Sequence, residues 1–160
     1  MILIGLGANL PSAAGPPAAT LAAALVALEA AGVAVERRSS WYRSAPLPAD
    51  DQPWYVNAVV AVRTGLGPAE LLALLHRIEA DFGRRRMRRN EPRVLDLDLL
   101  DYHGLVRQEA PVLPHPRLHE RAFVLLPLEA VAPQWRHPLT GAGLAELIAA
   151  LPPGQRAERL

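Results

Sequence analysis

Two aspartates separated by one residue are the feature of this sequence that most directly suggests chemistry. Asp96 and Asp98 alternate with leucines in the run Val94-Leu95-Asp96-Leu97-Asp98-Leu99-Leu100. Side chains at i and i+2 of a β-strand share a face, so the two carboxylates are expected on one face and the alternating leucines in the core. Neighbouring carboxylates repel each other, and hard oxygen ligands with no His or Cys beside them favour Mg²⁺ completed by phosphate oxygens. An edge strand whose solvent-facing side carries two aspartates would show the same pattern.

A cluster of arginines comes just before the aspartates. Its members fall within ten residues and are Arg84, Arg85, Arg86, Arg88, Arg89 and Arg93. Guanidinium groups bind phosphate through paired hydrogen bonds, and a divalent cation beside them would neutralise the charge that develops during phosphoryl transfer. The combination favours nucleotide phosphoryl chemistry over a merely solvated basic loop. Because no G-x-x-x-x-G-K-[ST] motif occurs, the phosphates are not expected in a Walker-type loop.

A third group of residues is suited to recognising a flat heterocycle. Tyr55 and Asn57 are separated by one residue in an apolar run, so a ring and an amide are expected on one strand face. If Asn57 is buried, its amide must find hydrogen-bond partners. Phe123 would offer an apolar ring for stacking. The alternative for both Tyr55 and Phe123 is ordinary core packing.

The pattern along the chain predicts a single α+β domain over residues 1–160 that would hold these groups. The β-strands are expected at 1–6, 33–42, 54–62 and 94–102, and the helices between them at 16–31 and 68–82. The order β-α-β-β-α-β is typical of a ferredoxin-like antiparallel sheet with helices on one face. Additional C-terminal helices are expected at 121–131 and 144–151, and loops at 44–53 and 83–93. The helix at 68–82 should bury Leu71, Leu72, Leu75 and Ile78.

Composition limits the possible functions. A chain of 160 residues with 51% hydrophobic residues can fold around a substantial core, and its net charge of +1 argues against a general nucleic-acid binder. No apolar run approaches the ~18 residues that span a membrane, and no basic segment precedes the apolar start as in a signal peptide. The absence of cysteine excludes disulfides, thiol catalysis and Cys-ligated zinc. We therefore expect a cytoplasmic protein that binds neither nucleic acid nor membranes. A monomer is a separate expectation, which composition does not decide.

Taken together, several segments resemble the 6-hydroxymethyl-7,8-dihydropterin pyrophosphokinase family. The run Pro92-Arg93-Val94-Leu95-Asp96-Leu97-Asp98 resembles the P-R-x-x-D-x-D signature of that family. Gly5-Leu6-Gly7-Ala8-Asn9-Leu10 is similar to its opening G-x-G-S/A-N-L. Further similar segments follow in the same order at 39–47, 52–58, 113–116 and 121–125. Several motifs in the right order are more specific than any one of them.

The resemblance implies a reaction and a set of residues. The reaction is transfer of pyrophosphate from ATP to the hydroxymethyl group of 6-hydroxymethyl-7,8-dihydropterin in folate synthesis, with release of AMP. Two Mg²⁺ ions would be held by Asp96 and Asp98, and the catalytic residues would be Arg84, Arg86, Arg93 and Asp98. The ATP-binding residues would be Leu72, His76, Glu79, Arg84, Arg86, Arg93, Leu99, His115 and Arg121. The pterin-binding residues would be Ser44, Ala45, Leu47, Tyr55, Asn57, Asp96 and Phe123.

The sequence departs from the usual pattern of the family at three places. Asn90-Glu91 stand before Pro92 where the family generally has Trp-Gly, and His76 stands where Gln is common. The segment 108–112 lacks an Arg and a Thr that some members place near ATP. These changes bear on nucleotide affinity and on closure of the arginine-rich loop more than on the type of reaction.

Two rival interpretations use the same residues. A non-catalytic ferredoxin-like module could bind RNA through the arginine-rich loop, which would call for exposed aromatic rings that stack on bases. A metal-dependent phosphodiesterase or nuclease could use the two aspartates, but would not need both ATP and a pterin. Neither rival accounts for all the motifs.

Overall fold

An antiparallel β-sheet forms the centre of the computed structural model, which describes residues 1–46, 52–83 and 94–160. Within those residues the sheet has six strands in the order β5-β1-β4-β3-β6, and β2 pairs with β4 next to β3. Every pairing is antiparallel. The strands are β1 (Ile2–Ala8), β2 (Ala34–Arg38), β3 (Tyr42–Ser44), β4 (Tyr55–Arg63), β5 (Asp96–Tyr102) and β6 (Ala157–Arg159).

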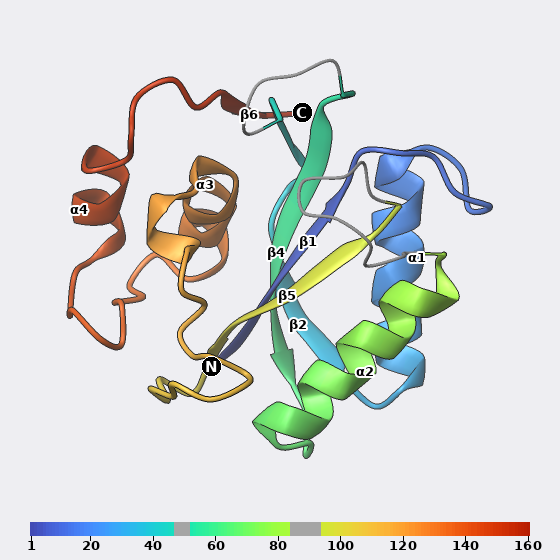
Figure 1. Ribbon diagram of the computed structural model, residues 1–160, viewed down its shortest axis with the longest axis horizontal. Coiled ribbons are helices and arrows are strands. Elements are labelled where there is room, and N and C mark those ends of the chain that lie inside the picture. Colours follow the sequence, from blue (N-terminus) through green and yellow to red (C-terminus); the bar gives the residue numbers. More distant parts are fainter. Residues whose placement is uncertain (47–51, 84–93) are drawn as a thin grey trace.

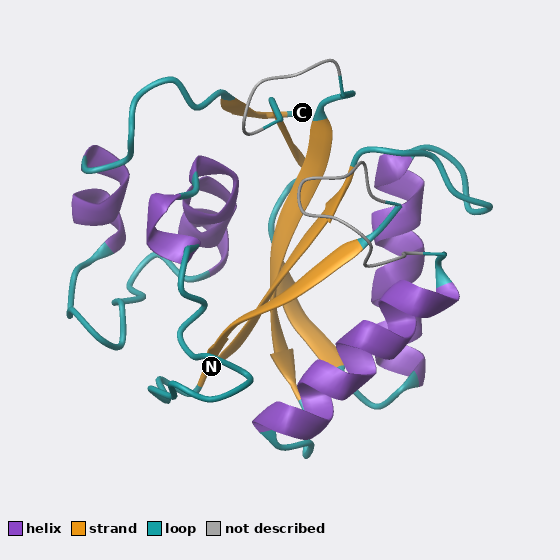
Figure 2. Cartoon of the chain, in the orientation of Figure 1, coloured by secondary structure: helices purple, strands orange, loops and turns teal. Residues whose placement is uncertain are grey.

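Helices cover both faces of the sheet. α1 (Pro17–Ala30) and α2 (Pro68–Asp81) lie on one face, and α3 (Ala122–Val131) and α4 (Leu144–Ala149) lie on the other (Figure 1). A 3-10 turn, η1 (Leu118–Glu120), leads into α3. Figure 2 shows the sheet as a layer between the two helical layers. Both faces of the sheet must therefore present apolar side chains.

Alternation along the strands fills two separate cores. On β1, Ile2 and Ile4 enter the core under α1 and α2, whereas Leu3 enters the core under α3 and α4. On β4, Val60 belongs to the first core and Val59 to the second. A strand buried on both faces reads as a continuous apolar run, which is why β1 and β4 were predictable.

The helix α2 differs from its prediction in one buried position. Its buried apolar residues are Leu71, Leu74, Leu75 and Ile78, whereas Leu72 is only partly buried. Leu74 is three residues after Leu71 and four before Ile78, so it completes the stripe along the axis. Including Leu72 in that stripe was wrong.

Two strand predictions also need correction. The strand expected at 33–42 is divided into β2 and β3, and in the break between them Val59 N–H donates to the side-chain oxygen of Ser39 (3.0 Å). A register shift between Val35 and Arg37 lies within β2 itself. The first strand does not end at Leu6 but continues to Ala8. The strand β6 was not predicted.

Among the residues that the structure describes, there is no helix whose length and hydrophobicity would let it span a bilayer.

Candidate active site

The two predicted carboxylates lie on β5, at the edge of the sheet. Asp96 is paired with Gly7 of β1, and Asp98 with Gly5. Leu97 and Leu99 are buried in the core under α1 and α2, so the aspartates point to the opposite face, the one covered by α3. The expected alternation of leucines and aspartates is confirmed, and the structure brings the two carboxylates to one face.

Glycines keep the sheet surface beside the carboxylates free of side chains. A Cβ placed on Gly7 would lie 3.2 Å from Asn57 Oδ1, and one on Gly5 would lie 3.4 Å from a Leu100 methyl carbon. Gly7 stands between Asp96 and Asn57 in the register, so no side chain of β1 separates the carboxylate from the amide. Glycine spacing in the opening motif was the available signal for this role.

A buried polar pair forms the next part of the same face. Asn57 and Ser44 are each 3% exposed, and Asn57 Nδ2 donates to Ser44 Oγ at 2.7 Å. Tyr55 is directly opposite Ser44 in the register between β4 and β3. The expectation that a buried Asn57 amide must be hydrogen-bonded is therefore confirmed. Ala45 follows Ser44, and its N–H donates to Arg156 O at 3.0 Å.

His115 approaches the carboxylates from the segment that precedes α3. Its N–H donates to Leu100 O (2.9 Å), which ties this segment to β5. Burial lowers the pKa of His115 to about 4, and Arg121 acts in the same direction while Asp96 opposes it. The N–H of Arg117 donates to His115 Nδ1 at 3.2 Å, so the neutral imidazole carries its proton on Nε2. His115 is therefore a neutral hydrogen-bond donor near a carboxylate.

Arg121 stands at the N-terminal end of α3, among the same groups. Burial lowers the pKa of Arg121, and the carboxylates of Asp98 and Asp96 oppose that shift. Its guanidinium carbon lies 5.5 Å from the centre of the Phe123 ring. Arg121 remains charged at neutral pH, as arginine does in proteins. Arg121 therefore lies between the two carboxylates and Phe123, the aromatic residue that is predicted to contact the pterin.

Glu79 reaches β5 from the α2 side. This carboxylate is 1% exposed and accepts a hydrogen bond from Leu97 N–H at 2.8 Å. Leu72 and His76 lie on the same face of α2 as Glu79, because they precede it by seven and three residues respectively. The side chain of Leu99 is buried in the core on this side of the sheet. The structure thus separates these four predicted nucleotide-binding residues from the carboxylate face.

Comparison with known proteins now identifies the family. The family model described as 7,8-dihydro-6-hydroxymethylpterin-pyrophosphokinase (HPPK) matches residues 3–133, a range that includes both carboxylates, His115 and Arg121. The chain belongs to the HPPK family. The resemblance inferred from the sequence motifs is therefore confirmed, and the RNA-binding alternative gains no support.

Two bacterial relatives are similar over most of this HPPK chain. Both are named 2-amino-4-hydroxy-6-hydroxymethyldihydropteridine pyrophosphokinase. The one from Methylorubrum extorquens is 48% identical over 132 residues, covering 81% of each chain. The one from Synechocystis is 43% identical over 148 residues, which are 91% of this chain and 73% of the relative.

A solved structure supports the fold of this HPPK chain. The HPPK-DHPS protein of Plasmodium falciparum superimposes with a TM-score of 0.73 over 93% of this chain at 14% sequence identity. The chain spans 44% of that longer protein. At this identity the likeness concerns the fold, an α+β arrangement with an antiparallel sheet.

Part of the predicted HPPK site lies outside the described residues. Leu47 and the arginines Arg84, Arg86 and Arg93 belong to this part, as do Asn90 and Glu91. Their assigned roles remain predictions.

One residue of the site received no role from the sequence. Asn9 is 2% exposed, and its Nδ2 donates to Gln52 Oε1 (3.2 Å) and Pro53 O (3.1 Å). It therefore joins the end of β1 to the segment that enters β4, close to the pterin-binding candidates. Its place in the opening motif Gly5-Leu6-Gly7-Ala8-Asn9-Leu10 was the available signal, but that motif alone assigned it no contact.

The carboxylate pair fits a magnesium site that is completed by a substrate. Among the described residues, there is no group of three His, Asp or Glu side chains that could hold a metal by themselves. Mg²⁺ commonly binds one or two carboxylates together with phosphate oxygens and waters. Asp96 and Asp98, beside the side-chain-free surface of Gly5 and Gly7, match that donor set.

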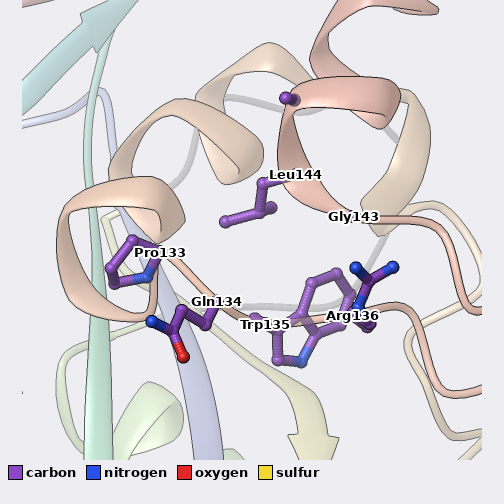
Figure 3. A pocket seen from close by; sticks show the side chains of 7 residues that line it. Pro133, Gln134, Trp135, Arg136, Gly143 and Leu144 are labelled. Atoms are coloured by element: carbon purple, nitrogen blue, oxygen red, sulfur yellow. The ribbon is translucent and has the colours of Figure 1, made fainter.

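A pocket elsewhere in the molecule contains none of these groups. It has a volume of about 420 Å³ and is lined by Pro133, Gln134, Trp135, Arg136, Gly143, Leu144 and Ala145 (Figure 3). Trp135 Nε1 donates to Asp101 Oδ2 (2.7 Å), which places the pocket near the opposite end of β5 from Asp96. The pocket and the cluster of ionisable side chains are therefore at different places, and the candidate active site is the cluster around Asp96.

Proposed function

We propose that this chain transfers a pyrophosphoryl group from ATP to the hydroxymethyl group of 6-hydroxymethyl-7,8-dihydropterin in folate biosynthesis, with release of AMP. The names of the relatives at 43% and 48% identity, 2-amino-4-hydroxy-6-hydroxymethyldihydropteridine pyrophosphokinase, support this proposal. One observation supports it best. The carboxylates of Asp96 and Asp98 lie on one face of the sheet, together with the neutral imidazole of His115 and the guanidinium of Arg121.

We assign the pterin to the part of this face beside Asn57. The Oδ1 of Asn57 lies above Gly7, and its amide nitrogen is already oriented by Ser44. An amide fixed in this way offers a donor and an acceptor to the edge of a heterocycle. Phe123 and Tyr55 would stack on the ring faces. The backbone of Ser44 and Ala45, together with Leu47, would complete this wall.

We assign the ATP phosphates to the side of Arg121 and His115. Arg121 supplies a positive charge, and His115 donates from Nε2 to a phosphate oxygen without adding charge. Arg84, Arg86 and Arg93 are predicted to add further guanidinium groups. The adenosine would contact the exposed His76 and the half-buried Leu72 on the α2 side, above the buried Glu79 and Leu99. Bound Mg²⁺, held as two ions by Asp96 and Asp98, would neutralise the charge on the phosphate oxygens.

In the reaction, these residues would position the two substrates and accept a proton from the pterin. The hydroxymethyl oxygen of the pterin forms a bond to the β-phosphorus of ATP. The bond from that phosphorus to the oxygen bridging it to the α-phosphate breaks, and AMP leaves with the bridging oxygen. Asp98 accepts the proton of the hydroxyl group. Fixed charges around the β-phosphate lower the barrier because they need no reorganisation as charge develops.

Finer features of the fold and its setting belong to this proposal. The strand order supports a ferredoxin-like classification if β2 and β3 together count as the second strand of the βαββαβ unit. On this view α3 and α4 are the additional C-terminal helices, and residues 1–160 form one domain. A monomeric state and a cytoplasmic location are further proposals, which sedimentation and cell fractionation would test.

Product analysis tests the function. The protein is incubated with Mg²⁺, ATP and 6-hydroxymethyl-7,8-dihydropterin, and the nucleotides are separated. We expect AMP to form only when the pterin is present, and the Asp96→Ala variant to form none. Formation of ADP or inorganic phosphate instead would contradict pyrophosphoryl transfer.

A further inference from the structure

The segment 152–160 returns to the proposed site although it lies beyond residues 3–133, which the family model matches. Its strand β6 pairs with β3, with Ala157 opposite Ser44 and Arg159 opposite Tyr42. Figure 1 shows this end of the chain beside the sheet, after it has passed α3. Ser44 belongs to the proposed pterin wall, so the segment adjoins the site.

Gln155 contacts the backbone on both sides of Arg121. Its Oε1 accepts a hydrogen bond from Ala122 N–H at 2.8 Å, and its Nε2 donates to Glu120 O at 2.6 Å. One side-chain amide thus fixes the carbonyl before Arg121 and the N–H after it. A side chain that bridges these two groups restricts the backbone torsions of Arg121 itself.

The contact also gives a hydrogen-bond acceptor to the first N–H group of α3. Ala122 is the first residue of that helix, so its N–H has no acceptor within the helix. Arg121 occupies the N-cap position and makes no side-chain capping bond. Gln155 therefore supplies, from a distant part of the chain, an acceptor for one of the N–H groups left unpaired at the start of the helix.

Gln155 is itself held against the pterin wall. Arg156 O accepts a hydrogen bond from Ala45 N–H at 3.0 Å, and the Arg156 guanidinium carbon lies 4.8 Å from the centre of a Trp54 ring. An ion pair between Arg43 and Glu158 joins β3 to β6. Residues 155 and 156 thus connect the backbone of Ala45, at the proposed pterin wall, with the backbone on both sides of Arg121, at the proposed phosphate site.

We propose that Gln155 is a positioning residue, which sets the place of the Arg121 guanidinium beside Asp96 and Asp98. This inference rests on the proposed function, because it assumes that Arg121 contacts the ATP phosphates. The side chain of Gln155 acts through Arg121 and does not contact the reacting atoms.

The test is a double-mutant cycle on AMP formation. We expect Gln155→Ala to lower kcat/KM for ATP about tenfold, because misplaced charges stabilise the transition state less well. In an Arg121→Ala background, Gln155→Ala should cause no further loss, because the residue through which it acts has gone. Gln134→Ala is the matched control, since Gln134 is exposed at the distant pocket, and it should leave kcat/KM unchanged.

If Gln155→Ala lowers kcat/KM by the same factor with and without Arg121→Ala, the two residues act independently and the inference is overturned. Gln155→Glu is the second variant if Gln155→Ala does not fold, because it keeps the acceptor for Ala122 N–H and loses the donor to Glu120 O. Hydrogen exchange gives a readout that needs no activity: the Ala122 amide should exchange faster in Gln155→Ala than in the unmodified protein. Unchanged exchange would refute the positioning role, whereas absence of AMP from the unmodified protein would refute the proposed function alone.

Discussion

The amide of Asn57 and the carboxylate of Asp96 lie on either side of Gly7, which adds no side chain to the surface between them. Any larger residue there would project its Cβ into this surface. Neither polar side chain creates the site alone, and the strand between them must contribute backbone only. The glycines of β1 therefore matter to the site as much as the polar residues do.

Gly7→Ala tests this dependence on the glycine. The new Cβ would lie 3.2 Å from Asn57 Oδ1, and Asn57 is restrained by its hydrogen bond to buried Ser44. We expect pterin affinity, measured by isothermal titration calorimetry, to fall about tenfold, or ~1.4 kcal/mol. Gly65→Ala is the control, because a Cβ on Gly65 meets nothing within 4 Å. Equal pterin affinity in the two variants would show that Gly7 is not needed for the shape of this surface.

His115 predicts a specific dependence of stability on pH. Its pKa is lowered from 6.5 to about 4 in the folded protein, so the unfolded chain binds more protons between these values. Protonation therefore favours unfolding progressively as the pH falls from 6.5 towards 4, and has no effect on stability above that window. His115→Gln lacks this contribution, whereas other histidines titrate equally in both proteins.

We expect the Tm of the unmodified protein to fall relative to that of His115→Gln as the pH is lowered from about 7 to about 4.5. The measurement is made without Mg²⁺ or ATP, so that ligand binding does not shift the folding equilibrium. Parallel curves over this range would contradict the buried, neutral imidazole.

At the scale of elements, β5 is held from α2 as well as from β1. It is an edge strand, and one of its outward N–H groups, that of Leu97, is satisfied by the buried carboxylate of Glu79. This contact fixes β5 at the residue between Asp96 and Asp98. Glu79 thus has a structural task beyond the nucleotide contact that the family resemblance implies.

Glu79→Ala measures that structural task. The substitution leaves Leu97 N–H without this acceptor, and we expect the free energy of unfolding in urea to fall by about 1–3 kcal/mol. Glu129→Ala is the control, because Glu129 is exposed near the end of α3, and it should change stability by less than about 0.5 kcal/mol. Equal effects of the two substitutions would show that the Glu79 contact adds no stability.

The elements that the sequence predicted are those with strong local patterns. The apolar runs of β1 and β4, the alternation in β5 and the stripe of α2 follow from burial of one or both faces, and so does the shared face of Asp96 and Asp98. The strand β6 has three residues, Ala157–Arg159, and forms only because β3 offers a partner. The contacts of Gln155 likewise join segments far apart in the chain, and no local pattern encodes them.

On the scale of the whole molecule, the sheet separates two tasks. The face under α1 and α2 is a largely apolar core, whereas the face under α3 combines a core near one end of the strands with the polar groups around Asp96. His115 and Arg121 bring the segment before α3 to that polar end. The ATP phosphates and the pterin would therefore meet on this face, where the hydroxymethyl group can approach the β-phosphate.

A crystal structure with both substrates tests this arrangement most directly. The protein is crystallised with Mg²⁺, 6-hydroxymethyl-7,8-dihydropterin and α,β-methylene-ATP, whose methylene group replaces the oxygen between the α- and β-phosphates and prevents transfer. We expect Mg²⁺ bound by Asp96 and Asp98, the β-phosphate near Arg121, and the pterin edge against Asn57. Nucleotide bound instead in the pocket around Trp135, with no Mg²⁺ on the two aspartates, would contradict the account.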